Sequence, residues 1–425
     1  MKAYDIYKNF FLSFIFLIFI FGMSIDYFSE VYTKVTAPVT EEKVIYTEEF
    51  EKLNPTINSE TNTKLSLIGK YKKTWKDFSS ALTASPTDLT INKFVLTVNT
   101  HFCNTAGMSY IPGTTFIKLD NGTLLSTGND SFNSQKMDTQ MNYLNNFMQT
   151  LKEKSINYVY IDCPNKDEIL GDKRPLGFRS TSKKEEKEYM FKSFEVNDIP
   201  SLRLGEKMIQ TENDANNMFY KTDHHWKTEF GIDAAFHIAE YLNTEFDYKI
   251  DTKIFNRSNY TPVTYEDCLL GSTGINSTIY FTEAEDYQIW YPNTEFEYSF
   301  VIPSKKISKT GNFDIFINME NINKKDNWPI NAYGSYLYSN SPYLKIENKS
   351  TDDSHKILII KDSYSHIIVP YLSQVIGRID VIDIRTIRGI NFKDNVTSLI
   401  EENNYDTVLF IYNEFPYEFD RLYLK

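Results

Sequence analysis

The chain has 425 residues, of which 41% are hydrophobic and 24% charged, as in an ordinary globular protein with one large domain or two smaller ones. Its net charge of -12 argues against nucleic acid and anionic lipid as main partners, because both are negatively charged. The three cysteines, Cys103, Cys163 and Cys268, form no paired motif. One disulfide is open to them, but we expect three free or buried thiols.

The N-terminus carries an apolar run. Lys2 and Lys8 precede Phe10–Ile25, which is almost wholly apolar but shorter than the roughly 20 residues of a comfortable membrane span. The run fits an uncleaved anchor or the apolar region of a signal peptide. A buried core helix is the alternative, which the lack of a polar face disfavours. We expect residues 1–25 to be a signal anchor or signal peptide, with the following chain outside the cytoplasmic membrane, or secreted after cleavage.

Residues 26–90 are polar, rich in Thr, Glu and Lys, and only weakly periodic. This composition is typical of a stalk or linker, with some helix around Lys70–Leu82. Residues 91–425 are then left for one globular domain.

The first half of this domain shows clear local patterns. We predict a strand at Phe94–Thr100 and a hairpin at Gly113–Leu125, with Asn121-Gly122 as its turn. Apolar residues recur at helical spacing from Met141 to Leu151, directly before a buried-type strand at Tyr158–Asp162.

Helices and strands alternate again near the C-terminus. The expected elements are strands at Ile357–Ile360, Asp380–Ile384 and Thr407–Tyr412, and helices at His366–Val375 and Asn395–Glu402. Such alternation predicts an α/β fold in which helices cover both faces of a parallel sheet.

Residues 260–316 instead show strand-like alternation, at Ser277–Phe281, Tyr287–Tyr291 and Glu295–Ile302. We interpret this stretch as a β-rich insertion. Its aromatic residues, such as Trp290, Tyr291 and Tyr298, either stack on sugars or, in the favoured interpretation, pack in the core.

Two short segments carry reactive side chains. The first, Tyr220–Trp226 (YKTDHHW), directly precedes an amphipathic helix, and the second, Lys361–Ser365 (KDSYS), ends an apolar strand and opens a helix. Ser363 would therefore lie at the carboxyl edge of the sheet, where α/β proteins bind ligands, and its amide is available to an oxyanion. A serine hydroxyl needs a base, and Asp223 followed by His225 supplies an oriented imidazole. In an extended backbone these two side chains lie on the same side, so we predict that His225 is the base and that His224 points the other way.

Simpler interpretations exist for both segments. Asp362-Ser363 is also a common helix cap. The pair His224 and His225 with Asp223 is a possible start of a metal site, but no third ligand follows at a recognisable spacing, so we expect no metal.

The strings DHHW and KDSY, in this order, resemble the DHHW family, which is related to the SGNH-type proteins of alginate O-acetylation. Softer similarities are Cys163-Pro164-Asn165-Lys166, Leu270-Gly271-Ser272, the segment from Tyr333-Gly334 to Asn340, and Asp383-Ile384-Arg385. The resemblance runs from about Phe94 to the C-terminus.

This resemblance implies a three-layer α/β/α SGNH-like domain, with Ser363 as nucleophile, His225 as base and Asp223 as the orienting acid. It also suggests Asn340, Arg385 and Lys166 as oxyanion or substrate ligands, although a turn residue and an ion pair explain Asn340 and Arg385 equally simply. Two features depart from ordinary SGNH enzymes. Lys361 stands where they have glycine, and the Asp-x-His pair precedes the serine, as in the circularly rearranged alginate-type branch.

The function implied is serine-dependent O-acetylation of a surface polysaccharide outside the membrane, without a cofactor. Its partners would be the polysaccharide acceptor and a multispanning membrane-bound O-acyltransferase that delivers acetyl groups. The alternatives are a carbohydrate O-acetyl esterase, with water as acceptor, and a non-catalytic binding or assembly subunit on the same fold.

Overall fold

The computed structural model describes residues 100, 103–110, 115–128, 131–178, 181–277, 281–322, 331–387 and 396–423. The predicted anchor, the stalk and, apart from Thr100, the predicted strand Phe94–Thr100 lie outside these residues. Among the described residues, no helix is both long and apolar enough to cross a bilayer. The chain forms two compact units, Met1–Ile117 with Pro175–Arg179, and Lys118–Arg174 with Ser180–Lys425. The main sheet and the candidate site lie in the second unit.

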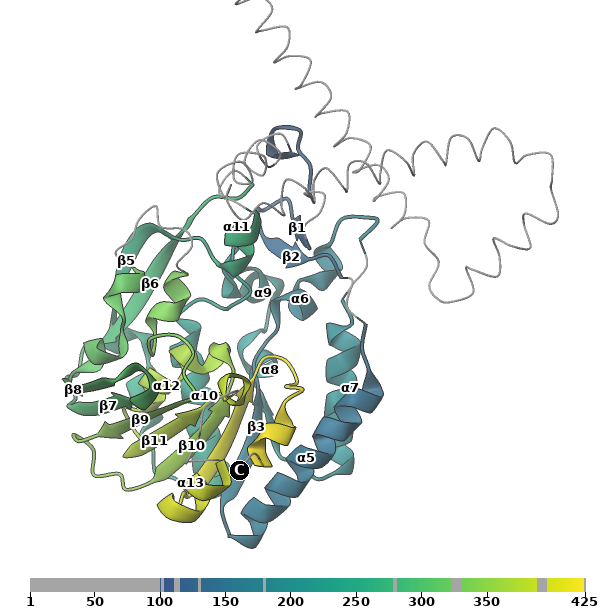
Figure 1. Cartoon of the computed structure of the whole chain (residues 1–425). Coiled ribbons are helices and arrows are strands. Elements are labelled where there is room, and N and C mark those ends of the chain that lie inside the picture. Colours follow the sequence, from purple (N-terminus) through teal and green to yellow (C-terminus); the bar gives the residue numbers. More distant parts are fainter. Residues whose placement is uncertain are drawn as a thin grey trace, which may run out of the picture. The chain divides into compact units, whose positions relative to one another are not determined.

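One eight-stranded sheet organises this unit (Figure 1). Its strands, in spatial order, are β4 (Ser201–Arg203), β3 (Asn157–Asp162), β12 (Thr407–Tyr412), β10 (Lys356–Lys361), β11 (Arg378–Ile382), β9 (Tyr343–Asn348), β7 (Tyr298–Ile302) and β8 (Ile307–Gly311). The first five strands are mutually parallel, and the last three continue the sheet with antiparallel pairing. The predicted mixed α/β fold with a large, mostly parallel sheet is confirmed.

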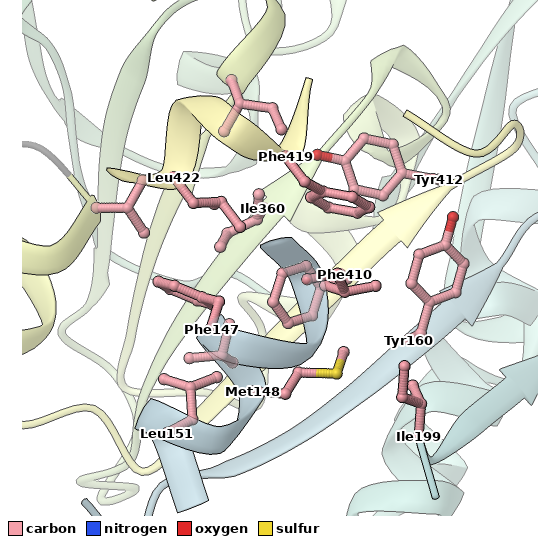
Figure 2. Packing of buried hydrophobic residues seen from close by; sticks show 14 of the residues in the cluster. Phe147, Met148, Leu151, Tyr160, Ile199, Ile360, Phe410, Tyr412, Phe419 and Leu422 are labelled. Carbon is pink, nitrogen blue, oxygen red and sulfur yellow. The ribbon is translucent and has the colours of Figure 1, made fainter. Parts of the chain in front are cut away.

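The central strands are apolar on both faces because both faces are covered. All six residues of β12 are buried, as are the last five of β10. On one face, α5 (Ser134–Glu153), α7 (Lys183–Val196) and α13 (Val396–Asn403) contribute to a single apolar cluster with these strands. Figure 2 shows Phe147, Met148 and Leu151 of α5 within this cluster.

The opposite face is associated with α10 (Phe230–Phe246), the predicted amphipathic helix after the DHHW string. Its apolar stripe, including Ile232, Ile238 and Leu242, is fully buried. Just beyond its end, the Tyr248 hydroxyl lies 2.9 Å from the Thr407 hydroxyl of β12. Thr407 and the next residue, Val408, point to opposite faces of the sheet. Val408 belongs to the apolar cluster that contains α5, so α10 and α5 lie on opposite sides of the sheet.

The remaining elements lie outside the main sheet. They are β1 (Phe116–Lys118), β2 (Leu124–Ser126), α6 (Lys166–Ile169), α8 (Leu204–Met208), α9 (Glu212–Met218), β5 (Tyr260–Leu269), α11 (Ser272–Ser277), β6 (Glu285–Pro292) and α12 (Val369–Leu372), with several single turns of 3₁₀ helix between them. The hairpin turn at Asn121-Gly122 is confirmed, since the Leu119 amide donates to the Thr123 carbonyl at 2.8 Å.

Two expectations about residues 260–316 need correction. Within this stretch β5 and β6 form a separate two-stranded sheet, whereas β7 and β8 extend the main sheet, so residues 260–316 are not a separate insertion throughout. Ser277 ends helix α11 and does not begin a strand. Tyr298 is fully buried, in agreement with the favoured interpretation that it packs in the core.

The predicted helix His366–Val375 is a 3₁₀ turn, η8 (Ser363–Ile367), followed by the short α12. No disulfide joins Cys103, Cys163 and Cys268, all of which are described.

Candidate active site

Ser363 lies where β10 ends, at the carboxyl edge of the parallel strands, and opens η8. The preceding residue, Asp362, is buried and fixes this turn through both carboxylate oxygens. One accepts a hydrogen bond from the Tyr364 amide at 2.9 Å, and the other from the Asn413 amide, just after β12, at 2.8 Å. The predicted helix cap and the predicted serine at the sheet edge are therefore one structure, in which Asp362 caps the turn that presents Ser363.

Ser363, His225 and Asp223 form a continuous hydrogen-bonded chain. His225 Nε2 lies 2.7 Å from Ser363 Oγ, and His225 Nδ1 lies 2.5 Å from Asp223 Oδ1. The structure thus brings together residues separated by 138 positions in the sequence. One imidazole nitrogen faces a hydroxyl and the other faces a carboxylate, which is the arrangement that lets a histidine take the proton of a serine.

Asp223 is completely buried, and its carboxylate is nevertheless satisfied on both oxygens. Oδ1 also accepts a hydrogen bond from the His225 amide at 2.9 Å. Oδ2 accepts from the Ser272 amide at 2.7 Å and from Asn331 Nδ2 at 2.6 Å. Burial alone would raise the pKa of Asp223, but the nearby His225 and His224 and the hydrogen bonds from His225 hold it well below its usual value. Asp223 is therefore ionised at neutral pH.

Glu285, at the start of β6, holds the segment before Asp223. Its carboxylate accepts hydrogen bonds from the Lys221 amide at 2.8 Å and from the amide and hydroxyl of Thr222, each at 2.7 Å. Gly271 packs directly against Asp223, because a Cβ built on Gly271 would lie 2.2 Å from the Asp223 Cβ. The predicted Gly-Ser element therefore has a structural reason: Gly271 allows close approach, and Ser272 donates its amide to Asp223.

Lys166 supports the same segment from the other side. It is 3% exposed, and its ammonium donates to the carbonyl oxygens of Tyr220 at 2.7 Å, Lys221 at 3.0 Å and Asp223 at 2.8 Å. A lysine ammonium has three protons, and here three carbonyls accept them. This geometry contradicts the expected substrate-binding role of Lys166. Burial lowers the pKa of Lys166 to about 8, against the raising effects of Glu285, Asp223 and Asp167.

Replacing Lys166 with Met should leave three backbone carbonyls without their donor. We expect the free energy of unfolding to fall by about 1–3 kcal/mol and kcat to fall, because Asp223 loses its support. Urea unfolding together with steady-state kinetics measures both quantities. The matched control is Lys173→Met, since Lys173 forms a partly exposed ion pair with Glu212 and should change little. Unchanged stability with a raised KM would favour substrate binding by Lys166.

His224 lies beside His225, and not on the opposite side as an extended backbone would require. Their ring centroids are 3.9 Å apart, and His224 Nδ1 lies 3.1 Å from Ser272 Oγ. The backbone bends here because the His225 amide turns back to the Asp223 carboxylate. Although 47% of the His224 side chain is exposed, desolvation and the neighbouring His225 lower the pKa of His224 to about 4, so His224 is neutral at neutral pH.

Aromatic side chains hold the imidazole of His225 in place. The Tyr333 ring stacks on it with a centroid distance of 3.8 Å and an interplanar angle of 15°. The buried Trp226 donates from Nε1 to the Tyr364 carbonyl at 3.3 Å, and the Tyr364 hydroxyl donates to the His224 carbonyl. The DHHW segment and the KDSY segment therefore hold each other through Trp226 and Tyr364.

Two of the predicted oxyanion or substrate ligands, Asn340 and Arg385, lie in surroundings other than those predicted. Asn340 is exposed, and among the described residues no hydrogen bond joins it to Ser363, His225 or Asp223. The Arg385 guanidinium donates two hydrogen bonds to the Asp383 carboxylate, at 2.9 and 2.7 Å. Arg385 is therefore in the ion pair that was its simpler explanation. Asn331, which sequence reasoning did not single out, is the amide side chain that reaches the site, and it contacts Asp223.

Lys361, which replaces the glycine of ordinary SGNH enzymes, points into the protein. It is 1% exposed, and its ammonium lies 2.7 Å from His366 Nε2 and 3.7 Å from the Asp383 carboxylate. Burial lowers the pKa of Lys361 to about 8 despite the raising effect of Asp383. Lys361 is therefore part of a buried polar group behind Ser363.

The nearby Asp223, His224 and His225 resemble the start of a metal site, because their ligand atoms all lie within 4.8 Å of one another. The two oxygens of Asp223 already accept four hydrogen bonds, and His225 is shared between Asp223 and Ser363. A cation there would have to displace these donors, so the arrangement favours proton transfer over metal binding.

Comparison with known proteins places this geometry in context. Residues 124–278 match the family model of the SGNH hydrolase-like domain of acetyltransferase AlgX. This span contains Lys166, Asp223 and His225 and ends before Ser363. No curated protein matches the chain.

Several solved structures share the fold. Bacillus cereus PatB1 aligns with a TM-score of 0.60 at 22% identity, over 73% of this chain and 99% of that one. Its form with a sulfonyl adduct aligns with 0.59 at 21%, over 73% and 97%. A DHHW family protein from Eubacterium siraeum aligns with 0.50 at 18%, over 70% and 89%. The resemblance predicted from the motifs is confirmed.

Proposed function

We propose that this protein is a serine-dependent O-acetyltransferase that modifies a surface polysaccharide outside the cytoplasmic membrane. The observation that carries the proposal is the hydrogen-bonded chain from Ser363 through His225 to Asp223. The match of residues 124–278 to an acetyltransferase domain supports the type of group transferred.

In the first half-reaction, Ser363 Oγ attacks the carbonyl carbon of an acetyl ester while His225 Nε2 takes the serine proton. Asp223 stabilises the resulting imidazolium. The tetrahedral intermediate collapses when the donor's oxygen leaves with the proton from His225, and acetyl-Ser363 remains. The amide of Ser363 can donate to the developing oxyanion because it stands at the first position of η8, before the turn's own hydrogen bonds begin.

In the second half-reaction, an acceptor hydroxyl gives its proton to His225 and attacks the acetyl carbon. Ser363 then leaves with the same proton, and the acetyl ester has moved to the acceptor. With water as acceptor, the same residues form a carbohydrate esterase.

A non-catalytic subunit would have no need for a satisfied, ionised Asp223 beside an imidazole that faces a serine, and for this reason it ranks third.

The location outside the cytoplasmic membrane is proposed from the N-terminal sequence, and the partner from the need for an acetyl donor on that side. The apolar run Phe10–Ile25 with its basic flank supports export of the rest of the chain. Because cytoplasmic acetyl donors do not reach that side, a multispanning membrane-bound O-acyltransferase would supply the acetyl group. Protease added to intact protoplasts should digest the body of the protein, and full protection would contradict export.

The experiment that tests the proposed reaction follows the acetyl group from 4-nitrophenyl acetate. With a panel of oligosaccharides present, acetyl should appear on sugar hydroxyls, and release of acetate to water should fall correspondingly. Acetate release that no oligosaccharide changes would favour the esterase. Absence of any acyl-enzyme would favour the non-catalytic subunit.

A further inference from the structure

A cavity of about 710 Å³ lies at the carboxyl ends of β3 and β4, on the same edge of the sheet as Ser363. Asp162 at the end of β3, Arg203 at the end of β4 and residues of α7 line it. Its volume is in the range of about 300–1,000 Å³ typical of small-molecule sites. The proposed acyl transfer at Ser363 uses none of these residues.

Strand order fixes how far this cavity lies from the serine. From β10, the sheet runs through β12 to β3 and then β4. Neighbouring strands are about 4.8 Å apart, so the ends of β3 and β4 lie roughly 10 and 14 Å from the end of β10. A single sugar whose hydroxyl is at Ser363 cannot also fill this cavity, but a longer glycan can reach both.

Several hydrogen-bonded polar residues lie between the serine and the cavity. The Asn413 amide donates to Asp362 beside the serine, and Glu414 accepts hydrogen bonds from Asn165 at 3.0 Å and from Lys183 at 2.8 Å. A small hollow is lined by Asn413, Glu414, Asn165, Lys183 and Lys187. Lys187 in turn borders the cavity, where it contacts Asp162 at 2.9 Å and Glu168 at 3.0 Å.

The lining indicates the chemical class of the ligand. The lining combines five acidic and four basic side chains with the apolar Ile169 and with Phe191, whose ring is covered by the Arg203 guanidinium at 3.7 Å. Charges so nearly balanced favour neither a polyanion nor a polycation. Carboxylates accept hydrogen bonds from hydroxyls, and ammonium and guanidinium groups donate to them, while the apolar part of the lining suits the C–H face of a sugar ring.

We propose that this cavity is a remote subsite for the acceptor glycan, binding a neutral, polyhydroxylated stretch of the chain whose hydroxyl is acetylated at Ser363. The proposal rests on the proposed function and adds to it a preference for long acceptors. It assigns the cavity residues to acceptor binding and leaves acyl-enzyme formation independent of them.

The test narrows the rim of the cavity and leaves the serine untouched. Glu188 is exposed on α7 and lines the cavity, so Glu188→Trp should obstruct it without disturbing the core. Glu185→Trp is the matched control, because Glu185 is exposed on the same helix but is not among the lining residues. The acceptors are cello- and chito-oligosaccharides of one to six units, and the donor is 4-nitrophenyl acetate.

For the wild-type protein, kcat/KM for the acceptor should rise with chain length for at least one series. Glu188→Trp should lower the value for the hexamer about tenfold, leave the monomer unchanged, and leave the burst of 4-nitrophenol unchanged. Glu185→Trp should behave like the wild type. Calorimetric binding of the hexamer to Ser363→Ala should weaken about tenfold when Glu188→Trp is added.

Two results would overturn the subsite: equal behaviour of the two Trp variants, or a loss that is the same for monomer and hexamer. Failure of both series to bind Ser363→Ala would overturn it as well. A wild-type protein that shows no burst of 4-nitrophenol would refute the proposed function itself. The two failures are thus distinguishable, since the burst reports on Ser363 and the length dependence on the cavity.

Discussion

Replacing His225 with Gln should lower the rate of acetyl transfer by about five to six orders of magnitude, as much as Ser363→Ala. His225 is the only described side chain that hydrogen-bonds both Ser363 and Asp223, so no other group can move the serine proton to a base. Because the residues act as a unit, the double variant should be scarcely slower than either single variant. Release of 4-nitrophenol from 4-nitrophenyl acetate measures the rate.

The adjacent histidine is the control for this experiment. His224 contacts Ser272 and is half exposed, so His224→Gln should cost no more than about tenfold, through acceptor binding or local stability. An inactive His224→Gln beside an active His225→Gln would contradict the assignment of the base.

Asp223→Asn should lower kcat by about four orders of magnitude, because an amide cannot hold His225 in the required tautomer or stabilise its charged form. The structure adds a second cost. Both carboxylate oxygens accept from N–H donors, so either orientation of the amide turns its NH₂ group toward donors from His225, or from Ser272 and Asn331. We therefore expect a lower free energy of unfolding as well, by roughly 1–3 kcal/mol.

Urea unfolding and steady-state kinetics on Asp223→Asn check the two effects, with Asn331→Leu as the milder comparison.

The sign of the pH dependence follows from the depressed pKa of Asp223. The carboxylate stabilises the wild-type fold above its unfolded pKa of about 3.9, and this contribution is lost as the pH falls below that value. An Asp223→Asn protein as active as the wild type would remove Asp223 from the mechanism.

The sequence predicted the parallel core because β3, β10 and β12 are largely apolar on both faces, and because β3, β11 and β12 follow helical segments. It missed β4, which has only three residues, and β9, whose alternating burial does not indicate which sheet it joins. The same ambiguity explains the error at β7 and β8. Alternation tells which face is buried but not which neighbouring strand pairs with it.

The motifs led to Ser363, His225 and Asp223, but the local reasoning about His224 was wrong. That reasoning assumed an extended backbone, whereas the chain bends where the His225 amide donates a hydrogen bond to the Asp223 carboxylate. Lys166 was found by its motif, yet a sequence cannot tell whether a lysine points to substrate or to backbone carbonyls. Glu285 and Asn331 lie 62 and 108 residues after Asp223, with no local pattern to identify them.

The most direct test of the central claim is mass spectrometry of the intact protein and its peptides after brief exposure to 4-nitrophenyl acetate. We expect one acetyl group on Ser363, its absence in Ser363→Ala, and its retention in Ser365→Ala, since the Ser365 hydroxyl is buried and donates to the Asp362 carbonyl at 2.9 Å. Labelling that persists unchanged in Ser363→Ala, or that resides on another residue, would contradict the account.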